Sequence, residues 1–189
     1  LSHHHGDHIG GAEVICEEMG AVALAHPCEM KLMVERHPRL AVNPLEDGGN
    51  IQVGPIGLCA VFTPGHSPGH LAFWWEKEKI LFGGDNVLLP VTTWVGAPYG
   101  NLRDYLASLR RMRDLATDII YPGHGPPVRD PKGRVETLLL HREKRDREIL
   151  GILSEGIDDP SLMAERIYSD LDERQRKMGA EVIVAHLEK

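Results

Sequence analysis

The chain has 189 residues, which is enough for one domain and a small appendage. With 42% hydrophobic and 26% charged residues, its composition is that of a folded globular protein, not of a disordered one. No run approaches the roughly 18 apolar residues of a membrane-spanning helix, and a net charge of −7 does not favour sequence-independent binding of nucleic acid.

The first feature along the chain is a dense group of metal-ligand residue types. They follow the pattern H-x-H-x-D-H, formed by His3, His5, Asp7 and His8. Three imidazoles and a carboxylate within six positions are typical of a metal site. His3 and His5 would project to one side of an extended strand end, and a tight turn at Gly6 would let the next two point elsewhere. The segment therefore predicts ligands for two metal ions.

The three consecutive histidines at positions 3–5 are also what a purification-tag remnant looks like. A tag would not be followed by Gly-Asp-His-Ile-Gly-Gly, nor matched by histidines later in the chain. We therefore favour the metal site, and we interpret His4 as a spacer and not a ligand.

The stretch up to residue 50 is predicted to alternate short helices with a strand: helix 12–19, strand 21–25, helix 27–35 and loop 38–50. His26 and His37 stand alone in this stretch, and we interpret both as non-ligands. Cys16, Cys28 and Cys59 are odd in number and have no metal-like spacing. They predict free thiols in a reducing compartment, which we take to be the cytoplasm.

Each remaining ligand candidate follows a predicted strand. Strand 58–62 leads to His66, the hairpin of 71–75 and 79–82 leads to Asp85, and strand 118–121 leads to His124. Loops at strand ends are places where a rigid sheet can present ligands. A lone aspartate after a strand is more often a turn or cap residue, but the Gly-Gly before Asp85 and the histidines on either side favour a ligand. His70 is interpreted as a group behind the ligands or a packed histidine.

The last third of the chain is predicted to be mainly helical. Residues 101–116 have the periodicity of an amphipathic helix, and the loop before it, 87–100, could line a substrate cleft or be a plain surface loop. After residue 133 the composition changes, and three further helices are expected over 135–154, 161–171 and from Asp172 onward. We therefore divide the chain into residues 1–132 and 133–189.

Taken together and in order, the ligand stretches resemble the metallo-beta-lactamase superfamily. The matching segments are His3–His8, Thr63-Pro64-Gly65-His66, Phe82-Gly83-Gly84-Asp85 and Tyr121-Pro122-Gly123-His124. The resemblance implies an α/β (α+β) protein with the αββα sandwich of that family. Because the motif begins at residue 3, it also implies a fragment whose N-terminal sheet is missing. The helices of 133–189 resemble a winged-helix tail without its wing, as in the beta-lactamase-like-protein-2 branch.

The resemblance further implies the roles of the seven residues. His3, His5 and His66 would hold one divalent metal ion, and Asp7, His8 and His124 a second, with Asp85 bridging the two. The expected cofactors are two zinc ions, with iron or manganese as alternatives. The implied reaction is hydrolysis by a metal-bridged hydroxide, for which Asp7 is the expected proton acceptor.

The substrate is less constrained than the reaction type, because the same ion pair can attack a carbonyl or a phosphorus centre. The acidic net charge favours an ester or thioester acyl substrate, either a small molecule or carrier-bound. An endoribonuclease that cleaves single-stranded RNA is the alternative. Residues 103–147 contain eleven Lys/Arg against seven Asp/Glu, a balance more typical of a solvated helix face than of a nucleic-acid groove. A non-catalytic metal-binding or redox module is a third possibility, and the oligomeric state is left open.

Overall fold

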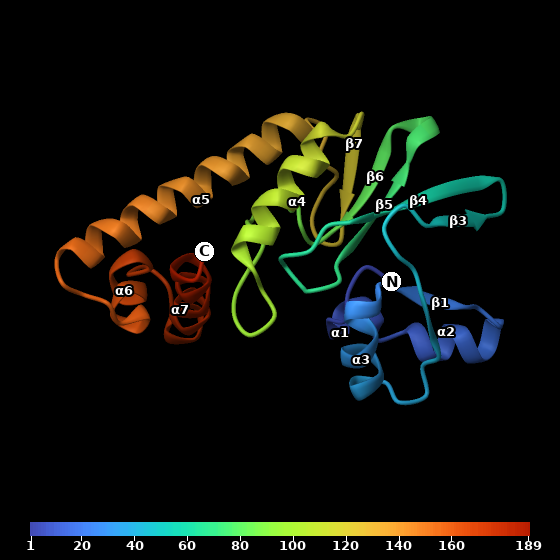
Figure 1. Cartoon of the computed structure of the whole chain (residues 1–189), viewed down its shortest axis with the longest axis horizontal. Helices are drawn as coiled ribbons and strands as arrows, with labels where there is room; N and C mark the ends of the chain where they lie inside the picture. Colours follow the sequence, from blue (N-terminus) through green and yellow to red (C-terminus); the bar gives the residue numbers. More distant parts are fainter.

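The computed structural model describes residues 1–189, and Figure 1 shows its arrangement. A small N-terminal lobe comes first, with two strands paired in parallel. Its elements are α1 (Gly6–Ile9), α2 (Ala12–Met19), β1 (Ala23–Ala25), α3 (Pro27–Arg36) and β2 (Val42–Pro44). Ile9, Ala25 and Met33 form a buried cluster that holds α1 and α3 against β1. Helices α2 and α3 and the strand β1 were predicted from the sequence, whereas α1 was not.

Two local expectations for this lobe were wrong. Gly6 does not form an isolated tight turn but begins the short helix α1, which places Asp7 and His8 on successive helical positions. The segment 38–50, expected to be loop, contains β2. Its pairing with β1 includes Ala25 opposite Pro44. A proline at a strand end is tolerated, because the amide hydrogen it lacks is not needed there.

A five-stranded sheet follows, in the order β3-β4-β5-β6-β7. Its strands are β3 (Asn50–Val53), β4 (Ile56–Phe62), β5 (Leu71–Trp75), β6 (Ile80–Gly84) and β7 (Ile119–Pro122). Neighbouring strands are antiparallel except β6 and β7, which are parallel. It follows that β4, β6 and β7 all run in the same direction, so their C-terminal ends meet at one edge of the sheet. The loops that carry His66, Asp85 and His124 start at this edge.

Helix α4 (Leu102–Asp114) covers one face of this sheet. Its buried residues recur every three or four positions, so they form one apolar stripe: Leu102, Tyr105, Leu109 and Met112. The stripe belongs to the main core, together with inward-facing residues of four strands: Val61, Ala72, Leu81 and Ile120. The predicted helix 101–116 is confirmed, and the mixed α/β class is confirmed with it.

The C-terminal helices are α5 (Pro131–Ser154), α6 (Pro160–Ile167) and α7 (Glu173–Leu187). The first half of α5 packs into the main core through Val135 and Leu138. Its second half extends away from the sheet (Figure 1) and forms a separate small core with α6 and α7, which includes Ile149 and Ile152. Since α5 takes part in both cores, it ties the helical region to the sheet. The division at residue 132 and the winged-helix identity of this region stay predictions.

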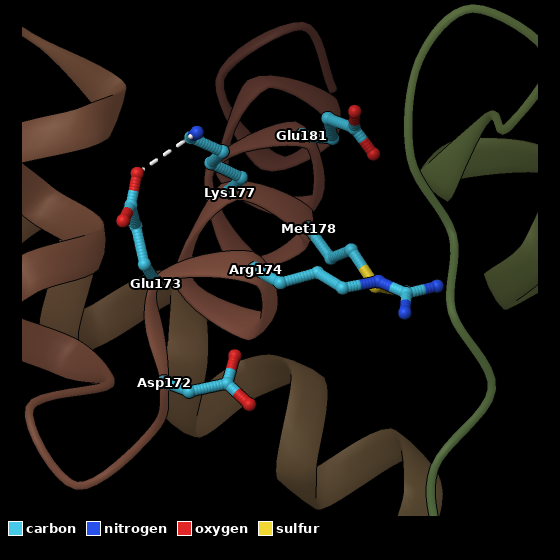
Figure 2. A pocket seen from close by; sticks show the side chains of 6 residues that line it. All are labelled: Asp172, Glu173, Arg174, Lys177, Met178 and Glu181. Carbon is cyan, nitrogen blue, oxygen red and sulfur yellow. Dashed lines mark ion pairs between the residues drawn. The ribbon is translucent and has the colours of Figure 1, made fainter.

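Helix α7 begins with a capping box formed by Asp172 and Gln175. Figure 2 shows a shallow hollow beside this first turn, where Glu173 and Lys177 form an ion pair at 2.9 Å. All of the side chains around it are charged except that of Met178. This is a solvated helix face and lies on a different element from every candidate ligand. None of the helices in the chain has the length and apolar character needed to cross a membrane.

Candidate metal centre

The seven predicted ligands meet at one edge of the five-stranded sheet. His66, Asp85 and His124 come from the loops after β4, β6 and β7, whose C-terminal ends lie together. Residues 3–8 lie over the same edge, and the amide of Leu71 at the start of β5 donates to the carbonyl of Ser2 at 2.9 Å. The sheet therefore fixes three of the predicted ligands and anchors the segment that supplies the other four.

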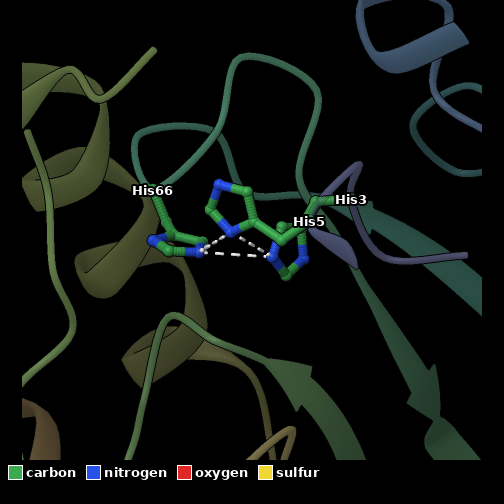
Figure 3. A group of neighbouring side chains, drawn as sticks. All are labelled: His3, His5 and His66. Carbon is green, nitrogen blue, oxygen red and sulfur yellow. Dashed lines mark hydrogen bonds between the residues drawn. The ribbon is translucent and has the colours of Figure 1, made fainter. Parts of the chain in front are cut away.

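The first group consists of His3, His5 and His66, shown in Figure 3 with their ring nitrogens pointing toward one another. The His3 Nε2, His5 Nδ1 and His66 Nε2 atoms are separated by 2.9, 3.1 and 3.2 Å. Each ring nitrogen is either a hydrogen-bond donor or an acceptor. Among three nitrogens in a triangle, at least two donors or two acceptors must therefore face each other, and that pair cannot form a hydrogen bond. A cation at the centre would satisfy all three lone pairs. Tetrahedral zinc with nitrogen at its usual distance needs ligand separations of roughly 3.3 Å, close to those observed.

The second group consists of Asp7, His8 and His124. His124 Nε2 lies 2.9 Å from Asp7 Oδ2 and 3.2 Å from His8 Nε2, and the remaining His8–Asp7 separation is 3.8 Å. These two imidazoles and one carboxylate offer a second set of three ligand atoms. The side chains of Asp7 and His124 are 58% and 50% exposed, whereas His3 is fully buried. The second group is therefore the solvent-facing side of the centre.

Asp85 lies between the two groups. Its Oδ2 atom is 3.7 Å from His66 Nε2 of the first group, and 3.3 and 3.7 Å from the Nε2 atoms of His8 and His124 of the second. Its Oδ1 atom is buried and has no hydrogen-bond partner. An orphaned buried carboxylate oxygen is costly. The structure therefore places a carboxylate where it could contact ions in both groups.

The electrostatics of the first group also suit a cation. Burial, reinforced by neighbouring histidines, lowers the pKa of His3 far below its ordinary value and that of His5 to about 4. Burial also lowers the pKa of His66. All three rings are thus neutral at pH 7, the form that offers a lone pair to a metal. The donor set of imidazole nitrogens and carboxylate oxygens fits zinc or iron-group ions.

The pKa values of the second group reflect its carboxylates. Burial would lower the pKa of His8, but its hydrogen bond to Asp85 and the charge of that carboxylate raise it above the ordinary value. Burial would raise the pKa of Asp85, but His8 and the neighbouring histidines hold it below its usual range. Asp85 is therefore ionised at neutral pH and supplies negative charge between the two groups.

A buried carboxylate that the sequence did not single out connects two of the ligand segments. Glu29 of α3 is fully buried and accepts hydrogen bonds from the backbone amide of His4 at 2.8 Å, from His4 Nδ1 at 2.5 Å and from the amide of Gly69 at 2.6 Å. Burial would raise the pKa of Glu29, but these hydrogen bonds outweigh burial and lower it. His4 is therefore no member of either ligand group; it links the first motif to α3.

His70 supports the ligands from behind. Thr63 Oγ1 and His70 Nδ1 are 2.9 Å apart, and His70 Nε2 accepts a hydrogen bond from the backbone amide of Asp85 at 3.1 Å. Full burial lowers the pKa of His70 to about 3, so the ring stays neutral and its accepting nitrogen is preserved. The structure thus places His70 outside both ligand groups and in contact with the Asp85 loop.

The loop 87–100 contributes through its backbone. The Trp94 carbonyl accepts a hydrogen bond from His66 Nδ1 at 2.7 Å, which fixes the tautomer with a free lone pair on Nε2. The loop that carries His66 is itself closely packed. Gly65 has φ of +127°, and a side chain there would collide with the backbone of Tyr105 in α4. Nothing in the local sequence pattern marks a carbonyl oxygen as functional, so sequence reasoning missed the role of Trp94.

His26, His37 and His186 lie outside both ligand groups, and the first two were interpreted as non-ligands from the sequence. His26 caps α3 and stacks on Phe62 with ring centroids 4.2 Å apart. His37 lies 4.0 Å from Glu13. His186 of α7 is 2.7 Å from Asp146 of α5, so it joins two helices of the C-terminal region.

We expect Gly123→Ala to weaken cation binding to the second group by about 10- to 100-fold, the usual range for a disturbed ligand environment. A Cβ at Gly123 would lie only 2.7 Å from His8 Cε1 and even closer to Asp85 Oδ1. Titration of the metal-free protein with Zn²⁺ measures the effect. Gly151→Ala is the matched control, because a Cβ there meets no atom within 4 Å. Equal affinities in the two variants would contradict the proposed crowding at Gly123.

A family model described as "Metallo-beta-lactamase superfamily" matches residues 1–124. The chain is 34% identical over 175 residues to a beta-lactamase-like protein 2 homolog from Caenorhabditis elegans, covering 90% of this chain and 56% of that protein. It is 32% identical over 183 residues to the lactamase-like protein vrtG from Penicillium aethiopicum, covering 96% and 55%. The chain thus spans about half the length of these two relatives.

Solved structures share the fold. A metallo-beta-lactamase family protein, TTHA1429 from Thermus thermophilus, matches with a TM-score of 0.84 and 29% identity, over 100% of this chain and 72% of that one. A beta-lactamase domain protein from Burkholderia ambifaria gives 0.88 and 25%, over 98% and 65%. TTHA1623, solved in a di-iron-bound form, gives 0.57 and 29%, over 68% and 70%. The C-terminal helical region is therefore included in the first two matches.

Proposed function

Because the chain belongs to the metallo-beta-lactamase superfamily, we propose that it is a hydrolase that acts with two divalent cations. The observation that carries the proposal is the position of Asp85 Oδ2 within 3.7 Å of ring nitrogens in both ligand groups. His3, His5 and His66 would hold one ion, and Asp7, His8 and His124 the other, with Asp85 shared between them. When bound, such ions supply Lewis acidity and a hydroxide nucleophile at neutral pH.

The residues around the centre determine the side from which a substrate approaches and the group that accepts the proton. A substrate would approach from the side of Asp7 and His124, since the other ligands are largely buried. Asp7 has a half-exposed carboxylate on that side, 2.9 Å from His124. It is therefore suited to accept a proton from the nucleophile as the new bond forms. The buried histidines of the first group, held neutral, would keep their positions throughout the reaction.

We propose zinc as the metal, with iron or manganese as alternatives. The N/O donor set suits all three, because no cysteine is among the ligands. Iron is supported as an alternative because TTHA1623, which shares the fold, was solved in a di-iron-bound form. Elemental analysis of the purified protein would identify the metals and their number per chain. Two ions per chain support the proposal, and a chain that binds none would overturn it.

For the substrate we propose an ester or thioester acyl group, either on a small molecule or on a carrier. The net charge of −7 supports this choice over single-stranded RNA, the second candidate. The two can be separated by salt, because contacts to several phosphates make binding fall steeply as salt rises, whereas a neutral acyl group gives a shallow response. Salt-sensitive RNA cleavage without thioesterase activity would reverse the preference. A protein that binds metal but hydrolyses neither substrate would favour a redox or binding module.

We expect Asp7→Ala to lower hydrolysis by about 10²- to 10⁴-fold, the usual contribution of a positioned proton acceptor. The assay is steady-state hydrolysis of a model thioester and of a single-stranded RNA, with metal content measured on the same samples. Asp170→Ala, at an exposed position in the C-terminal region, is the control and should behave as wild type. If Asp7→Ala kept its full metal content and the wild-type rate, Asp7 would not be the proton acceptor.

A further inference from the structure

An arginine of α5 lies in the core behind the metal centre without a carboxylate partner. Arg142 is only 3% exposed and takes part in no ion pair. Its Nη2 atom donates a hydrogen bond to the carbonyl of Thr93, its guanidinium lies 5.2 Å from the ring centroid of Tyr105, and its Nε atom has no partner. Burying an arginine without a counter-charge is costly. The two groups that it does contact lead to the ligands by separate routes.

The first route runs through Thr93. The Thr93 hydroxyl donates to the carbonyl of Asp85 at 2.5 Å, with the carbonyl of Asn86 at 3.1 Å. The next residue, Trp94, provides the carbonyl that accepts from His66 Nδ1 at 2.7 Å. One short segment therefore holds a residue of the first ligand group and the shared carboxylate. Arg142 binds the peptide carbonyl at the middle of that segment.

The second route runs through Tyr105, whose ring lies beneath the Arg142 guanidinium. The Tyr105 hydroxyl donates to the carbonyl of Asn86 at 2.9 Å, next to Asp85. The backbone of Tyr105 also packs directly against Gly65, the residue before His66. Both routes thus end at the same two ligands.

We propose that Arg142 is a positioning residue that sets the geometry of His66 and Asp85, and that α5 is in this way part of the metal centre. The proposal rests on the proposed function, because it assigns a role toward the cations. Without Arg142, the Thr93 carbonyl loses its donor and the 93–94 segment can turn. The His66 ring would then change its direction, and the Asp85 carboxylate would shift with the backbone that Thr93 holds.

Arg145 provides a matched control on the same helix. It too has a Nε atom without a partner and stacks on a tyrosine, with its guanidinium 4.4 Å from the Tyr168 ring centroid. It pairs with Glu148 at 2.9 Å and forms no hydrogen bond or ion pair with the loop 87–100. Loss of Arg145 should therefore disturb helix packing without changing the ligands.

The test has two measurements: the affinity of the protein for Co²⁺, and the visible absorption spectrum of the Co²⁺-loaded protein. The ligand-field bands of that spectrum report the geometry of the ligands around the ion and do not depend on the stability of the fold. We expect Arg142→Met to shift these bands and to weaken Co²⁺ binding by about 10- to 100-fold. Arg142→Lys should recover part of both, because its ammonium can donate to Thr93. Arg145→Met should keep the wild-type spectrum. Thr93→Val, which keeps the side-chain shape, should reproduce the spectral shift even if Arg142→Met folds poorly.

Wild-type spectra and affinities in both Arg142→Met and Thr93→Val would overturn the proposal and leave Arg142 as a packing residue. A combined Arg142→Met/Thr93→Val variant should lose less affinity than the sum of the single losses, because the two act through one route. Fully additive losses would likewise overturn the shared route. A wild-type protein that binds no Co²⁺ would instead refute the proposed function, and this inference with it.

Discussion

Asp85→Ala is expected to lose one of the two proposed cations and to lower turnover by at least about 100-fold, more than the loss typical of residues that only orient ligands. The carboxylate lies between the two groups, with its Oδ2 atom 3.7 Å from His66 of the first group and 3.3 Å from His8 of the second. Without it, two cations would repel each other across neutral imidazoles, so the second would bind only weakly. Metal content per chain and hydrolysis rate, measured on the same preparation, test this expectation.

Asp85→Asn separates charge from shape. It keeps the side-chain volume and one oxygen but removes the negative charge, so we expect it to resemble Asp85→Ala in metal content. Asp118→Ala is the control for an aspartate at the surface beside β7, where the side chain is 73% exposed. If Asp85→Ala kept two metals and wild-type turnover, Asp85 would be a turn residue, which is the commoner role of an aspartate after a strand.

Glu29→Ala is expected to destabilise the fold by about 3–5 kcal/mol, the usual cost of removing one partner from a buried charged network. The substitution would leave three buried donors without an acceptor: the amide and Nδ1 of His4 and the amide of Gly69. These donors belong to the loops that carry the first-group histidines. We therefore also expect weaker metal binding, beyond the loss of stability.

Urea unfolding of the metal-free protein measures the loss of stability apart from metal binding. Glu29→Gln should fall between wild type and alanine, because its carbonyl keeps one acceptor while its amide faces a donor. Glu35→Ala, on the exposed side of the same helix, should unfold like wild type. An unfolding midpoint of Glu29→Ala within error of Glu35→Ala would show that the three donors find other partners.

The positions of the candidate ligands could be predicted from the sequence because each depends on local information. The H-x-H-x-D-H pattern is contiguous, and His66, Asp85 and His124 each follow a strand that its own residues predict. What the strand pattern alone did not say is that these strands run in the same direction. That follows from the parallel pairing of β6 with β7, a contact between residues about 40 positions apart. The family resemblance supplied this part.

The groups behind the ligands could not be predicted in the same way. Glu29 looks like any helix glutamate in sequence, and only the packing of α3 shows that it accepts from two ligand segments. The Trp94 carbonyl has no side-chain signature at all, and Arg142 reads as part of a charged helix. The strand β2 was missed for a related reason. Its proline and neighbouring turn residues suggest a loop, and only its partner β1 makes it a strand.

The origin of the ligands along the chain has a consequence for folding thermodynamics. Each group combines residues from the first eight positions with a residue from a sheet loop, either His66 or His124. An ion in either group would therefore act as a cross-link between the N-terminal lobe and the five-stranded sheet, closing loops of very different lengths. Because the unfolded chain presents no such site, the free energy of binding would add to that of folding. The fold's resistance to heat would then be set by the concentration of free metal around it.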